Sequence, residues 1–287
     1  MDKSIRQHIE YLLCIKIESI RPLSGGDISK AYLIQSENEN LFCKIHLGDQ
    51  AFEMFSTERL GLQALGKTKS IGIPKVLLCE QLEKGALLVM DYIEPRLPSA
   101  IDFEKLGHQL AALHQPIQGE MFGFESENFI GSLPQSNHRH SNWISFYVKK
   151  RLLPQLKIAQ DLKRLERHEV PSENALLKIC DRLFPDIEPS LLHGDLWGGN
   201  FLISKSGEPF LIDPAAYYGY NEVDLAMTRL FGGFSNEFYE AYREVIPAES
   251  GEKERCDLYQ LYYLLVHLNL FGSSYKGSVT QILRRYF

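Results

Sequence analysis

The sequence predicts an α+β protein of two unequal lobes, a small β-rich N-terminal lobe and a larger, mainly helical C-terminal lobe. Apolar runs of strand length, separated by turns, dominate the first hundred residues, whereas helical periodicity dominates the rest. The proline-marked segment 95–98 separates the two patterns. The lobes are therefore expected at residues 1–94 and 95–287, and a ligand is expected in the cleft between them.

The N-terminal lobe is predicted to contain several strands and one helix. The helix is expected from Asp49 to Leu65, where apolar residues recur at spacings close to three or four. The expected β-rich runs are Leu12 to Ile20, Ala31 to Gln35, Leu41 to His46, Ile73 to Cys79 and Ala86 to Ile93.

The C-terminal lobe is predicted to contain longer helices with short strands between them. Pro116 should end the first helix, and Pro154 should kink the second. The expected helices are Phe103 to His114, Asn142 to Arg167, Glu173 to Leu183, Glu222 to Phe231 and Cys256 to Phe271. The expected short strands are Leu191 to His193, Phe201 to Ser204 and Phe210 to Ile212.

Composition narrows the function classes. The 31 Lys and Arg residues against 37 Asp and Glu residues give a net charge of −6, which argues against a general nucleic-acid binder. No apolar run reaches the ~20 residues that span a bilayer, and the N-terminus has no secretory pattern. Five scattered cysteines without a Cys-x-x-Cys pair indicate neither a disulfide framework nor a thiolate metal site. We expect a soluble cytoplasmic protein that binds neither membranes nor nucleic acids.

The segment 191–201 carries the strongest chemical pattern. Asp195 and Asn200 are separated by four residues, and Asp213 follows at the end of an expected strand. Phosphoryl transfer requires a carboxylate that positions the acceptor hydroxyl, and a carboxylate with an amide oxygen that hold Mg²⁺ against the phosphates. The protein-kinase catalytic loop has the same spacing, followed by a metal-binding Asp. The pair Gly198-Gly199 is expected to let a tight loop return the Asn oxygen towards the metal.

Other interpretations of this segment are weaker. A lone Asp after His-Gly is more often a helix cap, but the loop, the spacing and the second Asp together favour phosphoryl transfer. A metallohydrolase built on His193 and Asp195 lacks its remaining ligands. The residues 138–140 hold two histidines but no neighbouring carboxylate or cysteine, so we interpret them as a loop.

The residues 193–200, His-Gly-Asp-Leu-Trp-Gly-Gly-Asn, resemble the signature of the fructosamine kinase (ketosamine-3-kinase) family, which is related to aminoglycoside phosphotransferases. The resemblance extends from about residue 20 to residue 275. It includes the segments 128–135, 213–219, 222–227, 230–234, 259–262 and 267–272. It implies a bilobal protein-kinase-like fold and binding of ATP and Mg²⁺.

The resemblance implies roles for single residues. Asp195 would be the catalytic base, and Asn200 and Asp213 would be the metal ligands. Lys44, a charge in an apolar strand, is usually solvent-facing in such a pattern, but here it would bind the ATP α- and β-phosphates. A carboxylate of the following helix would orient it. Glu58 matches the family's position best, and Glu53 is the alternative because sequence does not fix the helix phase.

Two backbone segments are expected to bind the nucleotide. The turn between the first two strands would approach the phosphates, although most such turns are simple hairpins. Its residues are Gly25, Gly26, Asp27, Ile28 and Ser29. The lobe-connecting segment would hydrogen-bond the adenine edge through its backbone, and a plain core strand explains the same pattern. Its residues are Met90, Asp91, Tyr92 and Ile93.

Two further side chains are candidates near the acceptor. Trp197 would stack on a sugar, and His267 would reach a substrate hydroxyl, although core packing also explains either residue. His193 is interpreted as ordering the backbone around the metal site rather than as an acid or base.

The expected activity is ATP-dependent phosphorylation of the 3-hydroxyl of ketosamines, as in fructosamine or ribulosamine adducts, free or protein-bound, in deglycation repair. The first alternative is another small-molecule phosphotransferase of the same fold, acting on an aminoglycoside, choline or homoserine. The second is a nucleotide-binding pseudokinase scaffold. The four catalytic positions argue against it, because they carry residues able to act in phosphoryl transfer: Lys44, Asp195, Asn200 and Asp213.

Overall fold

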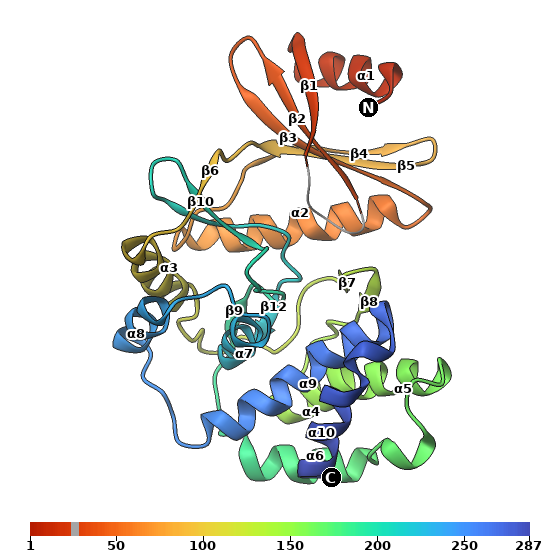
Figure 1. Cartoon of the computed structure of the whole chain (residues 1–287), viewed down its shortest axis with the longest axis vertical. Coiled ribbons are helices and arrows are strands. Elements are labelled where there is room, and N and C mark those ends of the chain that lie inside the picture. Colours follow the sequence, from red (N-terminus) through yellow and green to blue (C-terminus); the bar gives the residue numbers. More distant parts are fainter. Residues whose placement is uncertain (24–28) are drawn as a thin grey trace.

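A five-stranded antiparallel sheet forms one end of the molecule (Figure 1). The computed structural model describes residues 1–23 and 29–287. The strands lie in the order β1-β2-β3-β5-β4, so β2, β3 and β5 are interior strands and β1 and β4 are the edge strands of this sheet. The strands are β1 (Ile17–Leu23), β2 (Lys30–Ser36), β3 (Asn40–Leu47), β4 (Val76–Leu82) and β5 (Gly85–Asp91).

One helix covers each face of this sheet. Helix α1 (Lys3–Leu13) packs Ile9 against residues such as Cys43 of β3. Helix α2 (Ala51–Thr68) packs Phe55 and Leu62 against the opposite face, where Met90 lies. Because successive side chains of a strand alternate between faces, the even-numbered residues of β3 face α2.

The helix α1 corrects the expectation of a strand beginning at Leu12. Asp2 caps this helix by accepting a hydrogen bond from the Ser4 amide at 3.0 Å. The helix buries only Ile9 completely, but Ile5, Ile9 and Leu13 recur at steps of four and pack on the sheet, a helical periodicity that the sequence reasoning overlooked. The strand β1 therefore begins later, at Ile17.

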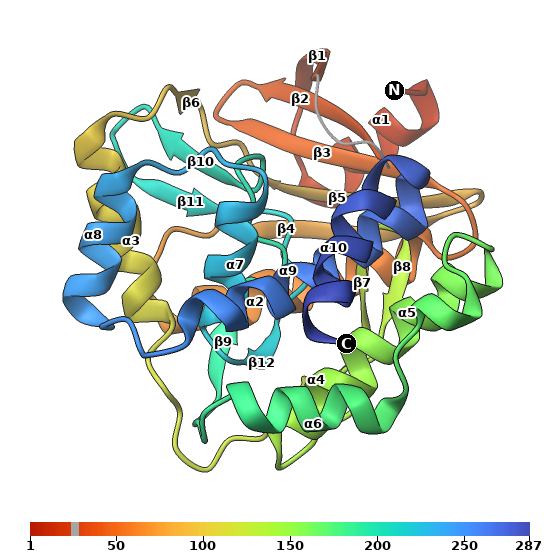
Figure 2. The ribbon, with the colours of Figure 1, turned by 60° about the horizontal axis from the view of Figure 1, so that its bottom comes forward.

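The remainder of the chain is mainly helical and contains small strand pairs (Figure 2). The helices are α3 (Ala100–Leu113), α4 (Trp143–Tyr147), α5 (Leu153–Asp161), α6 (Glu173–Leu183), α7 (Glu222–Leu230), α8 (Asn236–Val245), α9 (Glu252–Phe271) and α10 (Lys276–Tyr286). The strand groups are β6 (Pro95–Arg96) with β10 (Phe201–Ser204) and β11 (Pro209–Leu211), β7 (Asn128–Ile130) with β8 (Leu133–Gln135), and β9 (Ser190–Leu192) with β12 (Tyr217–Gly219).

The long helix expected from Asn142 to Arg167 is shorter and irregular. A π-helical turn, Val148–Leu152, separates α4 from α5, and Pro154 lies in the first turn of α5. Proline has no amide hydrogen to donate, so the wider turn before it accommodates the missing bond without ending the helix. The chain leaves the helix after Asp161.

Besides α1, the helices α8 and α10 were not expected from the sequence. Both are strongly amphipathic and carry many polar residues, and α8 buries Phe238, Ala241 and Tyr242.

The strand β6 pairs Arg96 with Ile203, so the chain is hydrogen-bonded to the helical part directly after Glu94. The lobe boundary between residues 94 and 95 stays a prediction. Among the described residues, no helix is long and apolar enough to span a bilayer.

Candidate active site

The loop 193–200 connects β9 to β10 and carries Asp195 and Asn200. Gly194 adopts a φ of +83°, and a Cβ at this position would lie 2.1 Å from the Ala215 carbonyl oxygen. Only glycine satisfies both the left-handed backbone and this close approach. The loop thus lies directly against the chain segment that follows Asp213.

Asp224, a residue of α7, anchors this loop. Its carboxylate, fully buried on α7, accepts hydrogen bonds from the amides of His193 at 2.7 Å and Gly194 at 2.9 Å. The ring of His114 also lies 3.1 Å from it. Burial opposes ionisation, but these hydrogen bonds and the nearby histidines outweigh it and lower the pKa of Asp224. The sequence reasoning missed this role; an acidic residue between the apolar residues Val223 and Leu225 of an expected helix was the available signal.

His193 connects the two segments that carry the carboxylates. Its Nε2 lies 2.8 Å from the Ile212 carbonyl oxygen, and its Nδ1 lies 3.3 Å from the Asp195 amide nitrogen. These partners require Nε2–H to donate and Nδ1 to accept. Burial lowers the pKa of His193, which favours this neutral ring. The side chain therefore orders the backbone on both sides of the site.

Asp195, Asn200 and Asp213 lie at neighbouring positions. The Asn200 amide nitrogen donates to the Asp195 carbonyl oxygen at 2.8 Å and to its carboxylate at 3.3 Å. The Ile212 amide donates to the Asn200 carbonyl oxygen at 3.0 Å, which holds Asp213 beside it. Since the Asn200 nitrogen is engaged, its side-chain oxygen is left for a cation.

Two features of the carboxylates suit a reaction site. Asp213 adopts a φ of +56°, a costly backbone conformation for a residue other than glycine. The pKa of Asp195 is raised to about 7, chiefly by burial and further by the charges of Asp213 and Asp224. A carboxylate with a pKa near neutrality is poised to accept a proton.

Lys44 reaches Asp213 from the sheet. Its Nζ lies 2.6 Å from Asp213 Oδ1 and 2.8 Å from Glu58 Oε1. Burial alone would lower the pKa of Lys44, but the two carboxylates raise it above its ordinary range. Burial, with the charge of Asp213, raises the pKa of Glu58 to about 7 although Lys44 opposes the change. Glu53, the alternative partner, is exposed in the first turn of α2.

The segment after β5 has few free backbone donors. The Asp91 amide donates to the Lys75 carbonyl oxygen at 3.0 Å, and the Tyr92 amide donates to the Asn40 carbonyl oxygen at 3.2 Å. Within the described part of the chain, the Ile93 amide makes no backbone hydrogen bond. An adenine edge would therefore find its donor at Ile93.

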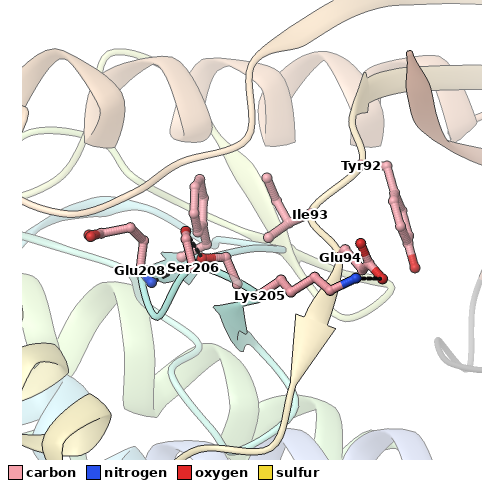
Figure 3. Close-up of a pocket in the computed structure, with 8 residues that line it drawn as sticks. Tyr92, Ile93, Glu94, Lys205, Ser206 and Glu208 are labelled. Atoms are coloured by element: carbon pink, nitrogen blue, oxygen red, sulfur yellow. Dashed lines mark hydrogen bonds and ion pairs between the residues drawn. The ribbon is translucent and has the colours of Figure 1, made fainter. Parts of the chain in front are cut away.

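A cavity of about 310 Å³ adjoins this segment (Figure 3). It is lined by residues 92–94, 204–206, 208 and 210, and Lys205 pairs with Glu94 at 3.0 Å on its rim. Phe210, which lines it, pairs across β10–β11 with Leu202, so both side chains share a face that also includes Ile212. This half-buried apolar face suits the flat side of a nucleobase. Sequence reasoning missed it, although alternation within the two strands was the signal.

The glycine turn cannot be placed in the same way. Gly25, Gly26, Asp27 and Ile28 lie outside the described residues. Ser29 forms a bend immediately before β2.

Glycine is needed after Trp197 for a reason other than the expected tight turn. Gly198 and Gly199 do not adopt positive φ. A Cβ on Gly199 would lie 2.3 Å from the Trp197 indole, so glycine leaves room for that ring. Trp197 itself is 42% exposed. The half-buried His267 lies on α9, and its Nδ1 donates to the Tyr263 carbonyl oxygen at 2.8 Å.

The donor set fits Mg²⁺. The described residues contain no group of three His, Cys, Asp or Glu side chains arranged for a metal. The site instead offers the Asn200 oxygen and the half-exposed Asp213 carboxylate. Mg²⁺ is commonly bound by one or two carboxylates together with substrate phosphates.

A loop Asp and Asn, a second Asp after a strand, and a Lys–Glu pair facing them from a sheet define a phosphotransferase of the kinase-like class. The chain belongs to the fructosamine kinase family, whose model matches residues 1–287. Ketosamine-3-kinase of Mus musculus is 37% identical over 94% of this chain and 96% of its own length. Protein-ribulosamine 3-kinase of Arabidopsis thaliana is 39% identical over 94% of this chain and 83% of its own length.

Solved structures agree with the fold. A crystal structure from Haemophilus somnus, assigned as a fructosamine-3-kinase, superposes with a TM-score of 0.86 at 27% identity, covering 99% of this chain and 96% of that one. The aminoglycoside phosphotransferase APH(4)-Ia gives 0.66 at 14% identity, covering 99% and 98%, and speaks to the fold alone. The kinase-like α+β fold and the family resemblance are both confirmed.

Proposed function

We propose that the protein is an ATP- and Mg²⁺-dependent kinase that phosphorylates the 3-hydroxyl of ketosamines, the adducts of sugars with amines. Its family and the names of its relatives support this substrate class. The observation that carries the proposal is the joint position of Asp195, Asn200, Asp213 and Lys44, linked by contacts of 2.6–3.3 Å. Phosphorylation at O3 makes the adduct unstable, so that the amine is released.

The chain's own residues account for the acceptor side of the reaction. The substrate O3 forms a bond to the γ-phosphorus, the bond from that phosphorus to the β,γ-bridging oxygen breaks, and ADP leaves. Asp195 accepts the O3 proton, a role that its raised pKa suits. Asp224 anchors the loop that holds Asp195 in position, and its lowered pKa keeps Asp224 itself ionised.

The nucleotide side uses the opposite wall. Lys44, oriented by Glu58, binds the α- and β-phosphates, and Asn200 and Asp213 hold Mg²⁺, which supplies charge neutralisation at the phosphates when bound. The Ile93 amide and the segment 90–93 bind adenine, and residues 25–29 are assigned to phosphate binding from their position in the sequence. Trp197 and His267 contact the sugar. We assign the enzyme to the cytoplasm.

The deciding experiment is incubation with Mg-ATP and a panel of acceptors. The panel contains a fructosamine, a ribulosamine, an aminoglycoside, choline and homoserine. The proposal predicts phosphate incorporation into the two ketosamines and background incorporation into the others. Transfer to another acceptor alone would favour the other phosphotransferases of this fold, and nucleotide binding without any transfer would favour a scaffold.

The metal ligands have a separate test. Asp213→Ala should weaken the affinity for Mg²⁺-nucleotide at least tenfold, measured by calorimetric titration with Mg-ADP, because half of the protein's donor set is lost. An affinity for Mg-ADP equal to that of the wild type would rule out Asp213 as a metal ligand.

A further inference from the structure

Aromatic rings surround His267 at the end of α9. The ring centroids of Phe231, Phe271 and Tyr275 lie 4.6, 5.4 and 5.2 Å from the His267 ring centroid. Phe231 is 41% exposed and Phe271 is 54% exposed. These two phenylalanines, which we call the aromatic surface, come from the ends of α7 and α9, helices that pack together (Figure 1).

The aromatic surface is continuous with the candidate active site along α9. Tyr263 donates its hydroxyl hydrogen to the Gly194 carbonyl oxygen at 2.8 Å, next to Asp195. His267 and Phe271 follow Tyr263 at successive steps of four residues, so the three share one face of the helix. Each step advances about 6 Å, so Phe271 lies about 12 Å along the helix from the residue that contacts the loop.

The aromatic surface is also connected to the loop through the residues that directly follow α7. Phe231 is followed by Gly232 and Gly233, and a Cβ on Gly233 would lie 3.1 Å from the Gly198 Cα. Gly198 stands beside Trp197 in the loop. The exposed rings therefore border the loop that carries Asp195.

The chemistry of the rings selects one part of a ketosamine. Three covalent bonds separate C3 of the sugar from the secondary amine, which is protonated at neutral pH. The face of an aromatic ring attracts a cation, and its apolar area covers an alkyl chain. An acceptor whose O3 meets Asp195 directs its ammonium group and the attached chain away from the reacting hydroxyl.

We propose that Phe231 and Phe271 bind the amine side of the acceptor, contacting the secondary ammonium and the alkyl chain that it carries. This inference rests on the proposed ketosamine kinase function. It predicts that the enzyme prefers adducts of long alkyl amines, such as a lysine side chain in a peptide, over adducts of methylamine. The preference belongs to these two rings, whereas the sugar half is bound elsewhere in the site.

The test compares two fructosamines that differ only in the amine, one made from methylamine and one from the Nε-amine of a blocked lysine. In the double variant Phe231→Ala/Phe271→Ala, kcat/KM for the lysine adduct should fall about tenfold, the order expected from losing two partly exposed ring contacts. For the methylamine adduct it should fall less than for the lysine adduct, by about threefold, because only the ammonium contact is lost. Phe271→Leu, which keeps apolar area but no ring, should give an intermediate loss.

Phe287→Ala is the matched control, because Phe287 is a 39% exposed phenylalanine at the chain end and should leave both activities unchanged. Equal losses for the two adducts, or no loss for either, would overturn the inference while leaving the kinase function intact. A dimer that the double variant dissociates, seen by sedimentation, would assign the surface to a second copy and also overturn it. Wild-type enzyme that phosphorylates neither adduct would contradict the proposed function itself, and the inference with it.

Discussion

Two sides of the candidate site are held in different ways. We call the loop 193–200 the first wall, and Lys44 with Glu58 the second wall. The loop with Asp195 is fixed by hydrogen bonds from its backbone to Asp224, which is buried in the helical part together with His114. Lys44 is fixed by two side-chain carboxylates, one from α2 and one from beyond the loop. The first wall is therefore ordered by its own core, whereas the second depends on charge contacts between the sheet and the helical part.

With the proposed roles, this difference separates phosphate transfer from nucleotide positioning. Changes to the first wall should remove phosphate transfer or destabilise the fold, because each backbone bond there has a buried partner. Changes to the second wall should weaken the use of ATP and leave the folded loop intact.

Asp195→Ala should lower kcat about 10³-fold, because the acceptor hydroxyl loses its proton acceptor. Binding of Mg-ADP, measured by calorimetry, should change less than about threefold, since Lys44, Asn200 and Asp213 remain. Turnover close to that of the wild type would show that Asp195 is not the base.

Asp224→Asn should lower the free energy of unfolding by about 3 kcal/mol, because a buried acceptor of three donors is replaced. It should also lower kcat, since the amides that position Asp195 lose their acceptor. Tyr242→Phe is the control: it removes only the hydroxyl 2.9 Å from His114 and should cost about 1 kcal/mol. Equal costs in urea denaturation would argue against Asp224 as the anchor.

Lys44→Met should raise KM for Mg-ATP about tenfold with a smaller effect on kcat, because a phosphate contact is lost while the loop is kept. Glu58→Gln should act in the same direction more weakly. Glu53→Gln, on the exposed side of the same helix, should change neither constant. A KM for ATP that is unaffected by Lys44→Met would show that Lys44 does not bind the nucleotide.

Asp195→Asn should stabilise the ligand-free protein at high pH. Folding raises the pKa of Asp195 from 3.8 to about 7, so the folded state binds its proton more tightly and stability is lost as pH rises from about 4 to about 7. The variant lacks this loss and should be more stable than the wild type at pH 8, with no such gain at pH 4. Denaturation at both values measures it; an equal difference at the two would contradict the pKa.

Local pattern predicted much of this molecule, and its limits have physical causes. The helix α6 has the expected bounds because it is amphipathic and capped by Ser172. The Lys44–Glu58 contact depended on helix phase, which tertiary packing fixes. The roles of Asp224 and of the face formed by Leu202 and Phe210 depend on contacts between segments that are distant in the chain. The helix α1 carries an apolar face that local pattern could have revealed.

The most direct test of the account is to locate the transferred phosphate. The enzyme is incubated with Mg-ATP and a fructosamine, and the product is examined by ¹H–³¹P correlation spectroscopy. The account predicts a phosphate on O3, formed one for one with ADP and absent with Asp195→Ala. A phosphate on another hydroxyl, or ADP formed without any sugar phosphate, would contradict it.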